Sequence, residues 1–465
     1  MRDSFKLPDT LVIMGSILLL MMLLTWIIPP GEFQRMEVDD RTLIEPGTYS
    51  AADFSGQSFT DLLLSPVKGF IEAAQIIAFV VIVGGAFQII QRTLAIQASL
   101  QHMVAYARRF PARKKWIIPL LTFFFSLAGA TFGMSEETLV FILITIPLAH
   151  SLGYDTFVGV AIPFLGAGAG FAGAFSNPFT IGIAQAIAEL PPFSGFGYRL
   201  ILWSVMTLIT VIFIMRYASK VEKDPQISTL SEDEKTGSGE FSQDDDIDFT
   251  LRRKLVLASL LLGIVALIVG VTQLGWYINE IAGLFMLLGV IAAILYRFHP
   301  NKVAKYFTEG AKEMLPAALV IAFSRGILIL AEEGKVIDTM LYHVSNWIDT
   351  FPNYLAVEGM FVFQTILNFF IPSGSGQAAL TMPIMTPLAD LLGISRQTAV
   401  MAFQLGDGLS NMIIPTSGVT MGVLTVARIP YQKWLKWALP LVLILALAGM
   451  IMLIPPVLMF DWGPF

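Results

Sequence analysis

The chain contains no cysteine and only four histidines among its 465 residues. Without thiols it can form no disulfide, no iron–sulfur cluster and no thiolate zinc site, and it has no cysteine nucleophile. The histidines, His102, His150, His299 and His343, lie far apart and lack the spacing of metal ligands. The sequence therefore predicts neither a metal centre nor a catalytic histidine.

Charged residues are also scarce. They make up 14% of the chain, whereas hydrophobic residues make up 55% and the mean hydropathy is +0.71. These values lie outside the range of soluble domains and indicate an all-α polytopic membrane protein surrounded by lipid. The net charge of -6 and the lack of a basic cluster with interleaved aromatic residues argue against a nucleic-acid partner.

Apolar runs of membrane-spanning length recur along the chain. They cover about 11–28, 67–90, 198–217, 255–271, 276–296, a run that ends near 331, and 437–453. The connector 92–115 and the hydrophilic linker 220–250 with its basic ends are placed in the cytoplasm by the positive-inside bias. The polar segment 32–61 is then an external loop. These assignments predict a cytoplasmic N-terminus and an external C-terminus.

Two apolar regions are interrupted by small and turn-forming residues where a membrane helix would continue. The first is broken at 129–137 and the second within the stretch 368–377. Irregular backbone at membrane depth is tolerated only where it lines a protected cavity. The sequence therefore predicts re-entrant hairpins at about 116–150 and 354–392.

Two further regions, about 155–190 and 396–429, are apolar but contain prolines and glycines, and we interpret each as an unwound spanning helix. The predicted breaks in the first lie at Pro163, 166–170 and 176–178, and those in the second at 406–408 and 414–418. For the run of small residues from Gly166 to Gly173, close helix packing is the favoured interpretation.

A constant offset relates the two halves of the chain. Gly133 corresponds to Gly374 and Gly69 to Gly310, and both pairs differ by 241 positions (374 − 133 and 310 − 69). The halves are predicted to be repeats, 1–219 and 251–465. The connector after residue 331 is acidic and therefore external, whereas its counterpart at 92–115 is basic and internal. The sequence thus predicts inverted repeats, an architecture of secondary transporters.

Helix ends at membrane depth expose unpaired N–H or C=O groups, which suit carboxylates and cations respectively. Glu136 and Glu137 are the sharpest candidates, because ionisable groups inside a membrane are costly. An N-cap at Ser135 with two acids in its first turn is the structural alternative. Since Gln377 and Ala378 occupy the matching positions, the turn does not demand acids.

Asp407 lies between two glycines and is expected to have a site role, whereas Asn177 and Asn411 could bind ligand or satisfy freed carbonyl groups. Arg325 could meet a substrate carboxylate, pair with an acid such as Glu332, or reach the interface. His150 and Asp390 are expected to be ordinary interfacial residues. The predicted substrate- and ion-binding residues are Gly133, Ser135, Glu136, Glu137, Ser176, Asn177, Ser373, Gly374, Ser375, Gly376, Gln377, Asp407, Asn411, Thr416 and Ser417.

Several motifs carry a family resemblance over nearly the whole chain. They are Pro8–Ile13, Phe132–Glu137, Asn177–Phe179, Phe307–Ala311, Ser373–Pro383 and Phe403–Gly408. At these positions the chain resembles the YfcC family of bacterial membrane proteins, related to the C4-dicarboxylate carrier (DcuC) group and to ArcD-type basic amino acid antiporters. The resemblance implies the ion transporter superfamily, with a scaffold domain that mediates homodimerisation, a mobile domain and elevator-type alternating access.

The sequence and the resemblance together predict a secondary active transporter of the bacterial inner membrane. Acids at the first hairpin and the second unwound helix favour a substrate with a cationic group, such as arginine or ornithine, taken up or exchanged. The alternative within this class is C4-dicarboxylate transport coupled to Na⁺ or protons, and outside it an ion channel. No enzyme is expected, because no H-E-x-x-H motif or nucleophile with a nearby histidine occurs. We expect the protein to bind its substrate and a coupling ion, and we place Na⁺ at the hairpin tips.

Overall fold

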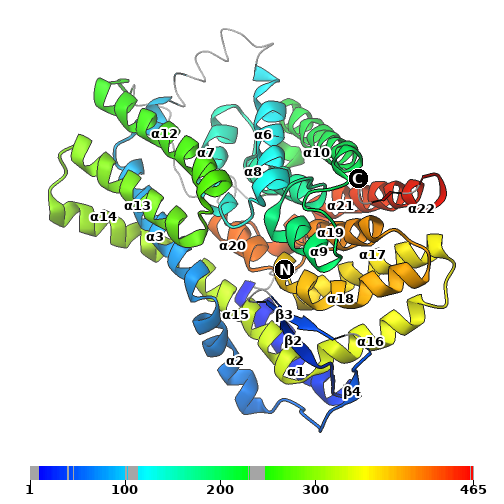
Figure 1. The fold of residues 1–465 in the computed structure, drawn as a ribbon. Helices are drawn as coiled ribbons and strands as arrows, with labels where there is room; N and C mark the ends of the chain where they lie inside the picture. The colour runs from blue at the N-terminus through cyan, green and yellow to red at the C-terminus, as the bar shows by residue number, and fades with distance from the viewer. Residues whose placement is uncertain are drawn as a thin grey trace, which may run out of the picture.

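The computed structural model describes residues 10–38, 41–45, 47–99, 102, 114–228, 230, 247–460 and 462–463. Within these ranges the chain is predominantly helical (Figure 1). Five of the described helices are long and apolar enough to cross a membrane. Four of them are α3 (Ala74–Gln91), α10 (Phe196–Lys223), α13 (Ile278–Leu295) and α15 (Leu315–Glu333). The fifth, α21 (Tyr431–Leu453), extends its apolar stretch to Leu458.

Some predictions fall on residues that the structure does not describe. These are the motif start at Pro8, the arginines Arg108, Arg109 and Arg113 of the first connector, and most of the linker 220–250. The described start of that linker differs from the prediction, because α10 continues as a helix to Lys223.

The segment predicted as an external loop contains short strands, which the all-α prediction missed. β1 (Gly31–Glu32) pairs with β4 (Ser50–Ala51), and β2 (Arg35–Val38) pairs with β3 (Arg41–Ile44), both antiparallel. Strands of two and four residues are too short to give an alternating sequence signal. Their ladders nevertheless pair the backbone groups of this segment.

The strands are fixed to the second half of the chain. Lys335 Nζ lies 2.7 Å from Glu32 Oε2, and the Gly31 N–H donates to the Lys335 carbonyl at 3.1 Å. The hydrogen bond from Lys335 holds the pKa of Glu32 below its usual range. Asp338, which is buried, accepts from the Phe33 N–H at 3.0 Å. The segment 31–51 therefore has a defined position against α15 and α16 (Val336–Ile348).

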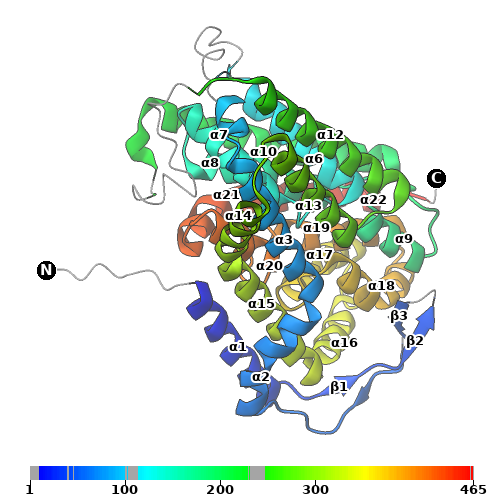
Figure 2. The same ribbon diagram turned by 90° about the vertical axis from the view of Figure 1, so that its left-hand side faces the viewer.

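One group of helices, α1–α3 and α12–α15, forms one side of the molecule, and Figure 2 looks onto part of it. The bounds not yet given are α1 (Thr10–Ile27), α2 (Phe59–Glu72), α12 (Leu251–Leu274) and α14 (Pro300–Glu313). The packing is reciprocal: α2 packs on α15 while α14 packs on α3, and α1 packs on α15 while α13 packs on α3. We call this group the first layer.

Glycines let these helices cross closely at equivalent places. A Cβ at Gly69 would lie 2.2 Å from the Ala322 carbonyl oxygen, and one at Gly310 would lie 2.3 Å from that of Gly84. The runs predicted as single spans are each divided at this point, since α2 ends at Glu72 before α3, and α14 ends at Glu313 before α15.

The remaining helices form a second group that contains both interrupted regions. Their bounds are α6 (Ile117–Phe132), α7 (Thr138–Ser151), α8 (Thr156–Ala172), the π-helix η1 (Pro178–Gly182), α9 (Ile183–Ile187), α17 (Asn353–Phe370), α18 (Gly374–Leu391), α19 (Arg396–Ser410), α20 (Gly418–Val426) and α22 (Pro455–Leu458). Both α6 and α7 pack against α8, and both α17 and α18 pack against α19. In turn α8 packs against α19, so the two halves meet through these helices (Figure 1).

The arms of the first hairpin are short. At about 1.5 Å per residue, the 16 residues of α6 and the 14 of α7 span about 24 and 21 Å, less than the hydrocarbon core of about 30 Å. This length fits arms that enter and return, as predicted.

Three of the predicted breaks are wrong, two in the first region and one in the second. Helix α8 is continuous through Pro163 and 166–170. Proline leaves the carbonyl four residues earlier without its helical donor, and here the Thr145 hydroxyl donates to that Gly159 carbonyl at 2.7 Å. A Cβ at Gly170 would lie 1.8 Å from the Ser126 carbonyl oxygen, so close packing explains this glycine.

Helix α19 likewise continues through Gly406, Asp407 and Gly408. The two glycines are contact positions, because a Cβ would lie 2.6 Å from Gln364 Cβ at Gly406 and 2.5 Å from Ala172 Cα at Gly408. The observed interruptions are therefore restricted to 173–177 and 411–417.

Candidate functional site

The tip of the first hairpin is an irregular turn between α6 and α7. Helix α6 ends at Gly133, whose φ of 72° is left-handed, and α7 begins at Thr138. Ser135 is not a side-chain cap; instead its N–H donates to Glu137 Oε2 at 3.0 Å and its carbonyl accepts from the Thr138 hydroxyl. Glu137 therefore supports the turn.

The tip of the second hairpin presents a helix N-terminus. Ser373 is the N-cap of α18, and its hydroxyl accepts from the Gly376 N–H at 3.3 Å. This capping leaves the first N–H groups of α18, around Gly374 and Ser375, at the tip.

Polar side chains occupy the breaks in α8–α9 and α19–α20. Asn177, fully buried, accepts from the Phe179 N–H at 2.9 Å and lies against the first tip, since a Cβ at Gly133 would be 2.6 Å from its Oδ1. Asn411 donates to Asp407 Oδ1 at 3.0 Å, and Ser417 caps α20. Each break is thus ordered by its own side chains.

The two hairpin tips, the two helix breaks and the first layer enclose one cavity of about 260 Å³. Its lining includes the N-terminal ends of α7, α18 and α20. The lining residues from the two hairpin tips are Gly133, Met134, Ser135, Glu136, Glu137, Thr138, Pro372, Ser373, Gly374 and Ser375; those from the second break include Asn411, Met412, Thr416, Ser417 and Gly418.

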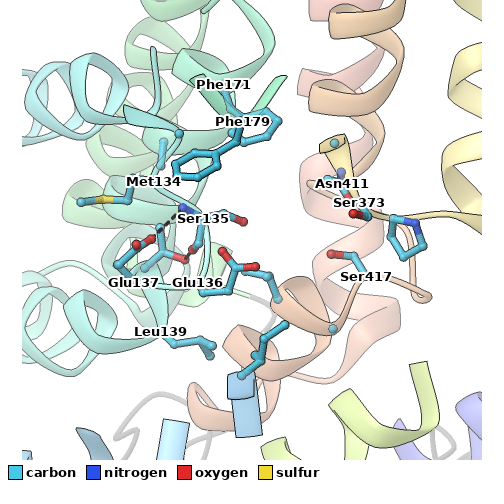
Figure 3. Close-up of a pocket in the computed structure, with 18 of the residues that line it drawn as sticks. Met134, Ser135, Glu136, Glu137, Leu139, Phe171, Phe179, Ser373, Asn411 and Ser417 are labelled. Carbon is cyan, nitrogen blue, oxygen red and sulfur yellow. Dashed lines mark hydrogen bonds between the residues drawn. The ribbon is translucent and has the colours of Figure 1, made fainter. Parts of the chain in front are cut away.

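The two acids of the first tip point in different directions (Figure 3). The Glu136 carboxylate projects into the cavity on the side that faces Ser417, whereas Glu137 turns back toward its own hairpin. Glu137 is 8% exposed. Glu136 is therefore the acid placed to meet a ligand, and Glu137 is the acid that shapes the turn.

A cation also lines the cavity. Arg325 and Ser324 of α15 are both among its lining residues. Arg325 pairs with Glu72 of α2, with 2.8 Å between Arg325 Nε and Glu72 Oε2, so the acid that it contacts is Glu72 rather than Glu332. The cavity lining thus includes both a carboxylate and a guanidinium.

Behind the second tip lies a group of oxygen atoms without hydrogen-bond partners among the described residues. They are Asp407 Oδ2, Asn368 Oδ1 and Asn411 Oδ1. Asp407 and Asn368 are fully buried, and the Asn368 amide donates to the Asp407 carbonyl at 3.1 Å. A Cβ at Gly374 would lie 2.9 Å from Asp407 Oδ2, so this oxygen faces the hairpin tip.

The structure brings most of the predicted site residues to one place, but not all of them line the cavity. Gln377 is fully buried and donates to Gln364 Oε1 at 2.7 Å, which ties the arms of the second hairpin together. Asn177 and Asp407 lie directly behind the tips. The predicted residues outside the cavity lining are Ser176, Asn177, Gly376, Gln377 and Asp407.

Sequence reasoning missed the aromatic part of the lining. Phe171 and Phe179 flank the first break, and Trp276 and Tyr277 come from the loop before α13. Phe179 and Tyr277 are in ring contact, with centroids 5.2 Å apart. Their closeness to the breaks was a signal for the phenylalanines, but nothing local connects residues 276–277 to either hairpin.

Histidines and acids form no metal centre in the described part of the chain, where no group of three such side chains could hold an ion. His150 contacts the Thr156 hydroxyl at 3.0 Å, and Asp390 forms an ion pair with Arg396 at 2.8 Å. Both side chains have local structural partners.

Comparisons with known proteins agree with the membrane architecture. The model of the C4-dicarboxylate anaerobic carrier family (DcuC) matches residues 7–458. YfcC of Escherichia coli (strain K12), named provisionally as a basic amino acid antiporter, is 36% identical over 471 residues, covering 93% of this chain and 92% of the relative. A Haemophilus influenzae protein named only as uncharacterized is 28% identical over 506 residues and covers 99% of each chain.

Among solved structures, the YdaH transporter of Alcanivorax borkumensis covers 97% of this chain and 98% of its own, with 16% sequence identity and a TM-score of 0.44. That similarity is too low to support an inference. The sequence relatives decide the assignment, because the family match spans nearly the whole chain and confirms the resemblance found from the motifs. The chain is a multi-pass membrane transport protein that belongs to the YfcC family, related to the DcuC carriers.

Proposed function

We propose that this protein is a secondary active transporter of the bacterial inner membrane that moves basic amino acids, such as arginine or ornithine, by uptake or exchange. The observation that carries the proposal is the single cavity lined by both hairpin tips and by both interrupted helices, with the Glu136 carboxylate directed into it. A carboxylate at membrane depth favours a cationic group. The provisional name of YfcC points to the same substrate class.

Transport proceeds by an elevator mechanism in this proposal. The hairpins and interrupted helices form the moving unit, and the first layer is the fixed scaffold. The cavity lies between them, since its lining combines the hairpin tips with Ile321 and Leu328 of α15. The scaffold also mediates homodimerisation, which a crosslinking or mass measurement in detergent can test.

We propose that a coupling cation binds at the oxygen atoms behind the second tip. Asp407 Oδ2, Asn368 Oδ1 and Asn411 Oδ1 are buried atoms without hydrogen-bond partners among the described residues. Buried oxygen atoms without partners are unfavourable, and a small hard cation such as Na⁺ would satisfy them. Interrupted helices are known to supply such sites in transporters.

C4-dicarboxylate transport is the second candidate, and a specific observation favours it. The N-terminal ends of α7, α18 and α20 line the cavity, and helix N-termini attract anions. Arg325 adds a positive charge to the lining. In this alternative Glu136 serves the coupling cation.

Counterflow in proteoliposomes tests the function. Vesicles loaded with unlabelled arginine, ornithine or succinate are diluted into the labelled compound, in Na⁺ and in K⁺ buffer. Trapped arginine or ornithine should stimulate uptake of labelled arginine several-fold. Stimulation by succinate alone would replace the proposal with the dicarboxylate alternative. Uncoupled conduction without counterflow would contradict a carrier and point to a channel.

A further inference from the structure

Arg325 occupies an unusual position for a charged side chain. It lies eleven residues into the apolar helix α15, whose bounds are Leu315–Glu333, and it lines the cavity. At the 241-residue offset its counterpart is Gly84 (325 − 241). The corresponding helix α3 therefore packs without a charge at this level, so packing does not require one here.

The partner of Arg325 uses only part of its hydrogen-bonding capacity. Glu72 Oε2 accepts from Nε at 2.8 Å, and no other hydrogen bond of this guanidinium is found among the described residues. Glu72 itself does not line the cavity. A guanidinium presents five donors in a planar fork, so its terminal N–H groups remain able to hold a carboxylate at two points.

The ion pair is also accessible. The side chains of Arg325 and Glu72 are 36% and 44% exposed. The pair is therefore not sealed inside the protein, and a second carboxylate can reach the guanidinium beside Glu72. Glu72 uses one donor of the guanidinium and holds it in place.

We propose that Arg325 binds the carboxylate of the transported molecule, that Glu136 binds its cationic group, and that Glu72 is the residue that positions Arg325. The proposal rests on the proposed function and restricts the class of substrate further. The substrate must carry a carboxylate and a cationic group on one molecule, since Arg325 and Glu136 line the same cavity and offer a complementary charge for each. The N-terminal ends of α18 and α20 lie on the same lining and favour the same carboxylate.

Ligands that differ only in the carboxylate test this inference in the unaltered protein. Purified full-length transporter in proteoliposomes is tested for inhibition of labelled arginine counterflow by arginine, by arginine methyl ester and by agmatine, which lacks the carboxylate. Arginine should inhibit at least ten-fold more strongly than either analogue. Equal inhibition by all compounds would overturn a carboxylate site while leaving the transport of cationic molecules in place.

Variants assign the effect to Arg325. Arg325→Gln should lower the affinity for arginine about ten-fold, to the level of agmatine, and leave agmatine unchanged. Retained agmatine binding also shows that the variant is folded. If Arg325→Gln does not yield folded protein, Arg325→Lys, which keeps the charge but loses the planar fork, should still reduce the preference for arginine over agmatine. An unchanged preference in the folded variant would overturn the inference.

Lys68→Gln is the matched control. Lys68 pairs with Glu333 across the same helices α2 and α15, at 2.5 Å, but does not line the cavity. This variant should keep the wild-type preference for arginine. An equal loss of preference in Lys68→Gln would show that any ion pair between these helices matters, and would overturn a specific role for Arg325. A wild-type protein that neither binds nor exchanges arginine or agmatine would instead refute the proposed function itself.

Discussion

At the scale of residues, two adjacent acids have different tasks. Glu136 projects into the cavity, whereas Glu137 accepts a hydrogen bond from the Ser135 N–H at 3.0 Å. A pair of acids in sequence cannot show this difference, because the direction of each side chain depends on the turn that carries it. The hydrogen-bonded acid has the role that an N-cap interpretation assigned to Ser135.

The first prediction compares the two amides. Glu136→Gln should weaken binding of arginine at least ten-fold, because the neutral side chain no longer attracts the cationic group. Glu137→Gln should keep the affinity within about three-fold, since its amide oxygen can still accept from the Ser135 N–H. Binding isotherms on purified protein give both values. Unchanged affinity in both variants would remove the reason for preferring cationic substrates.

The second prediction concerns Asp407. If Na⁺ binds the buried oxygen atoms, Na⁺ should raise the melting temperature relative to K⁺, because selective binding stabilises the folded form. Asp407→Asn should abolish this difference, since it replaces the charged oxygen that faces Gly374. Thermal unfolding in the two salts measures the effect, with Glu136→Gln as the control that keeps it. A Na⁺ shift that persists in Asp407→Asn would place the ion elsewhere.

At the scale of elements, the hairpin tips combine a sharp turn with close contact to an interrupted helix. Gly133 has φ of 72°, and a Cβ there would lie 2.6 Å from Asn177 Oδ1. Gly153, at the far end of the same hairpin, has φ of 82° and nothing within 4 Å of such a Cβ. A comparison of alanine variants at the two glycines therefore separates the effect of backbone strain from the effect of displacing the site.

The third prediction uses this pair. Both alanine variants should lose roughly 1–2 kcal/mol of stability from the left-handed backbone. Only Gly133→Ala should also reduce transport by ten-fold or more, because its methyl group displaces Asn177. Thermal melts and counterflow rates measured side by side test this. Equal transport in the two variants would mean that the contact between the tip and the break is unimportant.

A buried arginine connects a helix of the first half of the chain with a helix of the second half. Arg199 of α10 is fully buried and donates to Gln404 Oε1 at 2.7 Å and Gln397 Oε1 at 3.1 Å, both on α19. The Trp462 ring lies 5.2 Å from its guanidinium carbon. No carboxylate contacts Arg199 among the described residues; amide oxygens accept from its two terminal nitrogens, while Nε has no hydrogen-bond partner there.

The fourth prediction follows from that geometry. Arg199→Lys should lower the free energy of unfolding by about 1–3 kcal/mol, because one ammonium cannot reach both glutamines and leaves a buried group unsatisfied. Chemical unfolding monitored by tryptophan fluorescence measures the loss. As a control, Arg92→Lys changes an arginine whose side chain is 48% exposed in its pair with Glu309 and should alter stability little. Equal stability of both variants would contradict a stabilising role for the hydrogen bonds of Arg199.

At the scale of the whole molecule, the orientation in the membrane is the main prediction that can be tested directly. The chain has no cysteine, so single cysteines can be labelled without background. Asp53 in the strand-bearing loop and Lys302 at the start of α14 are both exposed. The fifth prediction is that Asp53→Cys reacts with an impermeant maleimide on intact cells, whereas Lys302→Cys reacts only after permeabilisation. The reverse pattern would invert the assigned topology.

The reciprocal packing of the first layer also belongs to this scale. Helices α2 and α15, and helices α14 and α3, cross at glycines related by the same 241-residue offset. The repeat was predicted from the shared offset of Gly69 to Gly310 and Gly133 to Gly374. Inverted repeats stay a prediction, which cysteine labelling of both halves can test.

The sequence by itself determined the class of protein, the positions of the hairpin tips and the family. These conclusions rest on local properties, which can be recognised without knowing which residues are in contact. They are the hydrophobic content, Pro and Gly at membrane depth, and the motifs at Phe132–Glu137 and Ser373–Pro383. The true ends of the interrupted helices were not local properties. Pro163 and Gly406–Gly408 looked like breaks, but Thr145 and Gln364 on neighbouring helices supply the hydrogen bond and the packing surface that keep those helices intact.

Only the tertiary structure decided which polar groups share the cavity. Glu136 and Arg325 are far apart in sequence yet line the same cavity, whereas Gln377, in a conspicuous motif, joins the two arms of its hairpin. The physical reason is that a side chain's direction and neighbours are set by helix packing across the two halves. The pattern of a sequence indicates which residues are placed away from lipid, but it does not indicate which of them are in contact.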